Sequence, residues 1–121
     1  MHPNKPEELK RRTKTFGLRV ISLISSLPRT DVAVIIGKQL VRCATAIGAN
    51  YRSACRARSR ADFISKIGVV EEESDEAVYW LEVLLEARMV NVEQVADLLK
   101  EGSELTAIFA ASEKTARSSR E

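Results

Sequence analysis

Carboxylates form the densest group of side chains that could do chemistry. In a helical bundle such a cluster could hold a di-iron centre, but that centre also needs Glu-x-x-His pairs on facing helices. The only histidine is His2, at the N-terminus. We therefore expect no metal site and a solvent-facing role for most of the cluster, which consists of Glu71, Glu72, Glu73, Asp75 and Glu76.

Nucleophilic side chains are present without a base to activate them. The chain has several serines and two cysteines, Cys43 and Cys55, but no suitably placed histidine. It has neither a GxGxxG motif nor a phosphate-binding loop with its lysine. We predict that the protein is not an enzyme and has no cofactor. The two cysteines share one predicted helix, about 18 Å apart, which excludes a disulfide within the chain. Both are expected to be buried as small apolar residues.

Basic residues are the more informative group. Residues 1–70 carry 14 Lys and Arg against 4 Asp and Glu, a net charge of +10, whereas residues 71–121 carry 5 against 13, a net charge of −8. A basic stripe on the second predicted helix, extended past the next turn, could hold a nucleic-acid backbone without reading its sequence. The alternative is that these cations pair with the acidic third helix, within or between subunits. The candidate residues are Lys38, Arg42, Arg52, Arg56, Arg58 and Arg60, and the first helix adds Lys10, Arg11, Arg12 and Lys14.

Three short breaks divide the chain into four segments with helical apolar spacing, at residues 6–27, 31–57, 60–88 and 92–117. Capping residues mark three of the starts: Thr30 or Asp31, Ser59 with Asp62, and Asn91 with Gln94. Short connections make each helix turn back along its predecessor. The sequence therefore predicts an all-α, antiparallel up-down-up-down four-helix bundle, with residues 1–121 forming a single domain.

The spacing also predicts which positions face the core. On the third helix Glu71 shares a flank with Ile64, Val78 and Leu85, so we expect it to be partly buried and paired with a basic group. On the fourth helix the predicted inner positions are Val95, Leu99, Gly102, Thr106 and Phe109, flanked by Leu98, Leu105 and Ile108.

Small residues on the second helix suggest a close helix contact or an oligomer contact. Glycine inside a helix costs about 1 kcal/mol relative to alanine, so a compensating contact is expected. This helix is also apolar outside its inner seam, for example at Val32 and Ile35, which favours self-association, although a tightly packed monomer is the alternative. The candidate close-packing positions are Gly37, Ala44, Gly48 and Cys55.

No apolar run approaches the length of a membrane span, because Arg19, Lys38 and Arg42 interrupt the best candidates. The N-terminal segment is charged and lacks the apolar middle of a signal peptide. We expect a cytoplasmic protein with no membrane partner.

Four segments of the chain form a recognisable set in this order: Ile36–Leu40, Gly48–Arg52, Ala57–Phe63 and Tyr79–Leu81. Together they resemble the four-helix-bundle family named for intervening sequences in bacterial 23S ribosomal RNA genes. The resemblance implies a bacterial protein without known catalysis, forming a ring-shaped homopentamer. The relatives of this family include accessory proteins of diversity-generating retroelements, which use a basic surface to engage nucleic acid and a reverse transcriptase. Many relatives carry an acidic residue near position 53, where this chain has Ser53.

These observations lead to two functional hypotheses. The first is a non-enzymatic, homo-oligomeric accessory protein that binds RNA or DNA backbone through its basic surface, in association with ribosomal RNA or a reverse transcriptase. The second is an oligomeric scaffold or protein-interaction module whose charges serve assembly alone.

Overall fold

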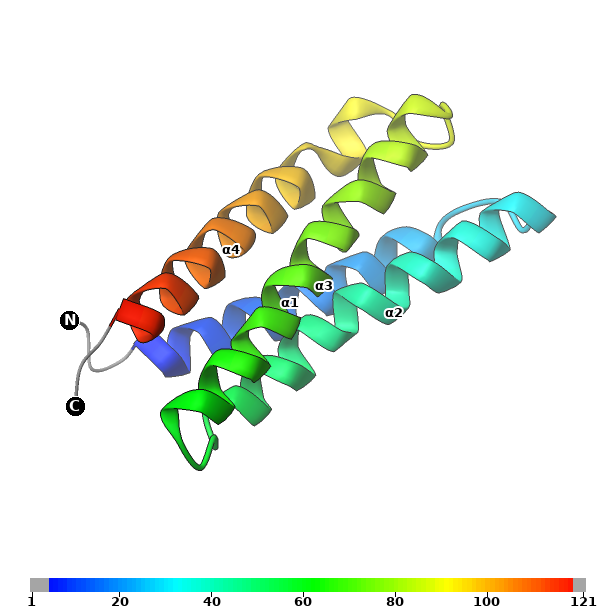
Figure 1. Cartoon of the computed structure of the whole chain (residues 1–121). Coiled ribbons are helices and arrows are strands. Elements are labelled where there is room, and N and C mark those ends of the chain that lie inside the picture. Colours follow the sequence, from blue (N-terminus) through cyan, green and yellow to red (C-terminus); the bar gives the residue numbers. More distant parts are fainter. Residues whose placement is uncertain (1–4, 119–121) are drawn as a thin grey trace.

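The computed structural model describes residues 5–118, which form four α-helices and no strand (Figure 1). Each helix runs antiparallel to the one before it, and α4 closes the bundle by returning to α1. The backbones of α1 and α3 do not approach each other closely, so these helices lie on a diagonal of the bundle. The predicted all-α up-down-up-down bundle is confirmed. Its helices are α1 (Lys5–Ser25), α2 (Asp31–Ala54), α3 (Arg60–Glu86) and α4 (Val92–Ser118).

The three capping signals all lie at helix starts. Thr30 caps α2 by accepting a hydrogen bond from the Ala33 amide at 3.1 Å. At the start of α4, Asn91 and Gln94 cap each other's backbone N–H groups, at 3.0 and 2.8 Å. These are the reciprocal bonds of a capping box.

The start of α3 is a variant of the same motif. Ser59 accepts from the Asp62 amide at 3.0 Å, but the Asp62 carboxylate accepts from the backbone N–H of Arg58, one residue before the cap. A second bond from Lys66 at 2.9 Å is the largest of the effects that lower the pKa of Asp62. α2 ends at Ala54, three residues before the predicted end, because the Arg56 and Ala57 amides bond to carbonyls three residues back and tighten the chain into a turn.

The α3–α4 turn places a side chain in the left-handed backbone region, since Arg88 has a φ of 62°. The Met89 amide bonds to the Leu84 carbonyl at 3.0 Å, and the Arg88 amide bonds to the Leu85 carbonyl at 3.0 Å. This pair of bonds is a Schellman motif, whose left-handed position usually holds glycine.

The core contains apolar side chains from every helix, with Phe16, Ile47, Leu81 and Phe109 fully buried. The rings of Tyr51 and Phe109 pack 5.3 Å apart. On α4 the predicted inner positions Val95, Gly102 and Phe109 are buried. Leu98 and Leu105 complete the inner face, whereas Leu99 and Thr106 are half-buried. The inner face of α4 is therefore rotated relative to the predicted one, because apolar residues lie on both sides of the predicted inner positions.

The small residues of α2 pack inside this chain. A Cβ on Gly48 would lie 3.4 Å from the hydroxyl of Thr13 on α1, and a Cβ on Gly37 would lie 2.9 Å from Ile24. Ala44 is buried opposite Gly17 of α1, where an added Cβ would lie 3.4 Å from the Ala44 carbonyl oxygen. Gly37, Ala44 and Gly48 therefore account for the close approach of α1 and α2, and this packing needs no second copy of the chain.

By length and apolar composition alone, α2 could cross a membrane. This was not predicted from the sequence, because Lys38 and Arg42 interrupt the apolar run. In the bundle α2 packs between α1 and α3, with Leu40, Cys43 and Ile47 fully buried. Burial in the core accounts for part of this apolar character, whereas Val32 and Ile35 are exposed.

Candidate functional site

The basic residues predicted as a single stripe separate into groups in the structure. Arg42 turns toward α3, where its guanidinium lies 2.9 Å from Glu76 and 3.4 Å from Glu73. Both are helix-to-helix ion pairs, so this part of the stripe matches the alternative in which the cations serve internal packing.

The remaining cations of α2, and Arg56 just after its end, face solvent. Lys38, Arg52 and Arg56 are exposed, and across residues 5–118 none of them forms an ion pair with a carboxylate. Arg58 is also exposed and lies beside Asp62, and Arg60 begins α3. The end of α2 and the turn into α3 therefore form a basic corner, made of Arg52, Arg56, Arg58 and Arg60.

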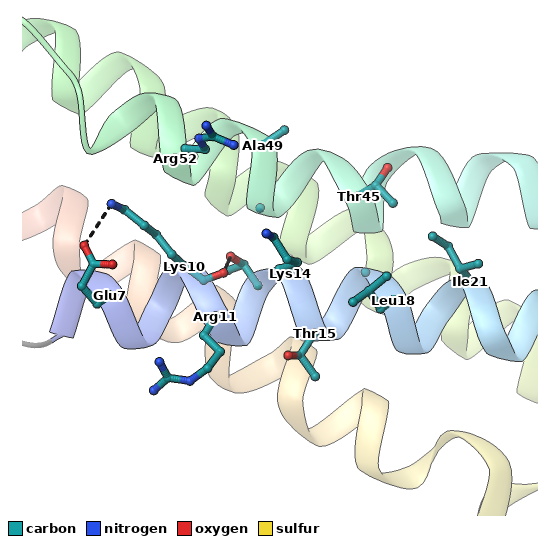
Figure 2. Close-up of a pocket in the computed structure, with 13 residues that line it drawn as sticks. Glu7, Lys10, Arg11, Lys14, Thr15, Leu18, Ile21, Thr45, Ala49 and Arg52 are labelled. Atoms are coloured by element: carbon teal, nitrogen blue, oxygen red, sulfur yellow. Dashed lines mark hydrogen bonds and ion pairs between the residues drawn. The ribbon is translucent and has the colours of Figure 1, made fainter.

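A groove between α1 and α2 adjoins the basic corner (Figure 2). We call it the outer groove, a hollow of about 670 Å³ whose lining changes character along its length. Lys10, Lys14 and Arg52 line one end, and Lys10 is paired with Glu7 at 3.1 Å. Leu18 and Ile21 line the other end.

The floor of the outer groove is made of small residues, Gly17, Gly48 and Ala49, with Thr45 beside them. The two glycines bring the helices close together and leave the floor without side chains. Leu18 is 58% exposed at the groove, and Ile35 elsewhere on α2 is 63% exposed. The α1–α2 hairpin therefore presents both cations and uncovered apolar side chains to solvent.

Arg12, the fourth cation of α1, belongs to a different site. Its guanidinium donates two hydrogen bonds to Glu101 on α4, at 2.9 and 2.7 Å, and one to Glu104 at 3.1 Å. The hydrogen bond from Arg12 lowers the pKa of Glu101. This cluster joins α1 to α4 and is unavailable to a ligand.

Glu71 is half-buried between α3 and α4, but its partner is a carboxyl group. Its hydrogen bond with Glu113 raises the pKa of Glu71, and burial adds to that shift. The pKa of Glu113 is lowered, chiefly by its hydrogen bond from Arg117, with which it forms an ion pair at 2.9 Å. The predicted direct pairing of Glu71 with a basic group was wrong, because the nearby cation binds the second carboxylate.

The two cysteines differ in environment. Cys43 is fully buried, and burial raises the pKa of its thiol to about 12. Cys55 is exposed, so the prediction that both are buried was wrong for it, because α2 ends one residue earlier. Cys55 borders a hollow of about 990 Å³ at the end of the bundle, where Leu9, Tyr51 and Phe63 form part of the wall.

The outer surface of α3 is acidic. Its exposed carboxylates form no ion pair within the described part of the chain, in contrast to Glu73 and Glu76. Within residues 5–118 no group of three or more candidate ligands is arranged to hold a metal ion. The exposed carboxylates are Glu72, Asp75, Glu82 and Glu86.

Residues 7–111 match the family model described as 23S rRNA-intervening sequence protein. The chain belongs to this family. The match includes the outer groove, the basic corner and the acidic surface of α3.

A solved structure of a family relative supports the same assignment. It is the crystal structure of a protein of unknown function from the S23 ribosomal protein family of Bacteroides thetaiotaomicron VPI-5482. The two chains are 33% identical, with a TM-score of 0.82 over 88% of this chain and 99% of the other. No curated protein sequence matches significantly. Neither the family description nor the structural relative's name denotes a catalytic activity.

Proposed function

We propose that this protein is a non-enzymatic, homo-oligomeric accessory protein that binds nucleic-acid backbone through its basic surface. The observation that carries the proposal is the set of exposed cations on α2 and just after its end. Of these, Lys38, Arg52 and Arg56 have no carboxylate partner within residues 5–118. Cations left without partners in a folded protein are available to phosphates, and binding releases the counterions condensed on the nucleic acid.

The arrangement suits backbone contact better than base readout. Arginine forks match phosphate oxygens, whereas base recognition needs an element that enters a groove and aromatic surfaces on which bases stack. The basic corner lies at a helix end and carries no aromatic side chain. Affinity should therefore depend strongly on salt and weakly on sequence.

Self-association has separate support from the exposed apolar residues of the α1–α2 hairpin, which include Leu18, Val32 and Ile35. Scattered exposed apolar residues are common in monomers, but several on one hairpin favour a protein contact. An assembly would also display several basic corners to one nucleic acid, which raises the apparent affinity.

The test is a titration of a duplex of about 20 base pairs, as DNA and as RNA, at several salt concentrations between about 50 and 300 mM. Each phosphate contact contributes a log–log slope of roughly −0.9 for duplex DNA. Reversing both charges in Lys38→Glu with Arg56→Glu should flatten the slope by about two per engaged subunit. Neither residue lines the outer groove.

A matched control reverses two cations on another helix. Lys100 and Lys114 are exposed on α4, so Lys100→Glu with Lys114→Glu changes the net charge equally. The control should retain the parent slope. Absence of parent binding at about 50 mM salt would contradict the proposal, as would equal slopes for both double variants.

The pairing of Arg42 with Glu73 and Glu76 favours a second candidate, an oligomeric scaffold whose charges serve packing and assembly. Under this alternative the parent is an oligomer in light scattering and binds neither duplex.

A further inference from the structure

The outer surface of α3 carries a ridge of exposed residues with an aromatic ring at its centre. Glu72, Tyr79 and Glu86 are spaced by seven residues, and Asp75 and Glu82 lie beside them, within about 80° of arc on the helix. Tyr79 is 54% exposed, and its ring packs edge-on against Trp80 at 5.0 Å. We call these five residues the acidic ridge.

The outer groove is complementary to the acidic ridge in shape and charge. The ridge exposes a large ring with carboxylates on either side of it. The groove is a hollow with a glycine floor, apolar Leu18 and Ile21, and the cation Lys14. Seven residues of helix rise about 10 Å, so a carboxylate lies about that far from Tyr79 in each direction. A ring on the groove floor would therefore place a carboxylate near Lys14.

The two surfaces cannot meet within one chain. The groove lies between α1 and α2, and the backbones of α1 and α3 do not approach each other closely. The face of α3 that does pack on α2 uses Glu73 and Glu76, which bind Arg42, and not the ridge. An acidic ridge that docks in the outer groove therefore has to belong to another molecule.

We propose that the acidic ridge of a second copy of this chain docks in the outer groove, with Tyr79 over Gly17 and Gly48 and the ridge carboxylates near Lys14. This inference rests on the self-association in the proposed function and specifies the two faces that meet. The contact is heterologous, since the two copies contribute different surfaces. One copy keeps its groove unused and the other keeps its ridge unused. Such contacts build closed rings or open chains.

Two variants test the contact, each of which damages one face. Lys14→Glu with Leu18→Glu damages the groove, and Glu72→Lys with Tyr79→Lys damages the ridge. Lys14, Leu18, Glu72 and Tyr79 are exposed, so both proteins should keep the helical circular dichroism of the parent. In light scattering at micromolar concentration each variant alone should fall to the 13.5 kDa monomer.

Mixing the two variants distinguishes a heterologous contact from a symmetric one. The groove variant retains an intact ridge and the ridge variant an intact groove, so an equimolar mixture should form a one-to-one dimer that grows no further. The control Lys100→Glu with Lys114→Glu should keep the parent mass.

Folded variants that both keep the parent mass would overturn the choice of faces. A mixture that stays monomeric would overturn the heterologous contact. A monomeric parent would instead contradict the self-association of the proposed function. Nucleic-acid binding is measured separately through Lys38 and Arg56, outside the groove, so its failure can be told apart from these results.

Discussion

Gly68 and Gly102 both stand inside helices, yet a methyl group would meet different surroundings at each. At Gly102 an added Cβ would lie 2.8 Å from Cγ2 of Val78 and 3.4 Å from the ring of Phe16. At Gly68 the nearest atoms would be the Glu113 carboxylate oxygens, at 3.9 and 4.0 Å. Gly102 is thus required by helix packing, whereas Gly68 has room for a side chain.

The two alanine substitutions should therefore shift stability in opposite directions. Gly102→Ala overpacks the α3–α4 contact and should cost about 1–3 kcal/mol. Gly68→Ala removes the helical penalty of glycine without a clash and should add about 0.5–1 kcal/mol. Urea unfolding of both variants measures the difference, and destabilisation by Gly68→Ala would contradict the reading of its surroundings.

The shared proton of Glu71 and Glu113 predicts a dependence of stability on pH. The pKa of Glu71 is raised on folding, so its contribution is present below the unfolded value and is lost as the pH rises through the folded value. The pKa of Glu113 is lowered, so its contribution is lost as the pH falls through its folded value. The pair is best satisfied between the two, when it holds one proton.

Glu71→Gln should remove the requirement for that proton, because the glutamine amide can donate to Glu113 at any pH. We expect the melting temperature at pH 7 to rise by a few degrees, with little change between pH 4 and 5. Thermal melts across this range, with Glu72→Gln as the exposed control, measure the effect. An equal rise in melting temperature at pH 4 and at pH 7 would show that the pair of carboxyl groups is not the source of the stabilisation.

The contact between α1 and α4 is the least extensive of the four contacts between helices. Arg12 on α1 donates two hydrogen bonds to Glu101 on α4. Both side chains are about three-quarters buried, so screening by water is reduced. We expect a coupling of about 0.5–1.5 kcal/mol in a double-mutant cycle with alanine at both positions.

The pH dependence of this coupling follows from Glu101. Its pKa is lowered on folding by Arg12, so the stabilisation is present above the unfolded value and disappears as the pH falls through the folded value. Repeating the cycle at pH 7 and near pH 3 tests the sign. A coupling that survives unchanged at the lower pH would point to side-chain packing in place of charge.

The α3–α4 turn has a non-glycine residue where the backbone favours glycine. Arg88 adopts a φ of 62°, which costs roughly 1 kcal/mol for a side chain other than glycine. Arg88→Gly should therefore stabilise the protein by about 0.5–1 kcal/mol, whereas Arg88→Ala should not. If the two variants unfolded at the same urea concentration, backbone strain at this turn would be excluded.

Helix starts could be predicted because their signals are local. The Asn91–Gln94 pair spans one turn, so residue type and spacing suffice to predict it. The orientation of α4 could not be predicted in this way, since Leu98 and Leu99 fit either rotation and packing with α3 decides between them. Likewise, the partner of Glu71 lies 42 positions away on another helix, and no local pattern identifies it.

For the whole molecule, the charge difference between the two halves of the sequence becomes a difference between two hairpins. The α1–α2 hairpin holds the outer groove and Arg52 of the basic corner, and α3 carries the acidic ridge. The charge difference could be predicted from the sequence, but the division of the cations into paired and exposed ones could not. Only the structure separates Arg42, which pairs internally, from Arg52 and Arg56, which remain exposed.

Cys43 on α2 and Cys55 just after its end can together report how often the helical bundle opens. Cys43 is sealed in the core as a neutral thiol with a pKa of about 12, so a maleimide can reach it only while neighbouring helices separate. Cys55 is exposed and reports the reactivity of the reagent in the same sample. The first maleimide adduct, on Cys55, and the second, on Cys43, each increase the mass of the protein. The delay between the two increases therefore measures how rarely the bundle opens. A binding partner that holds the helices together would lengthen this delay.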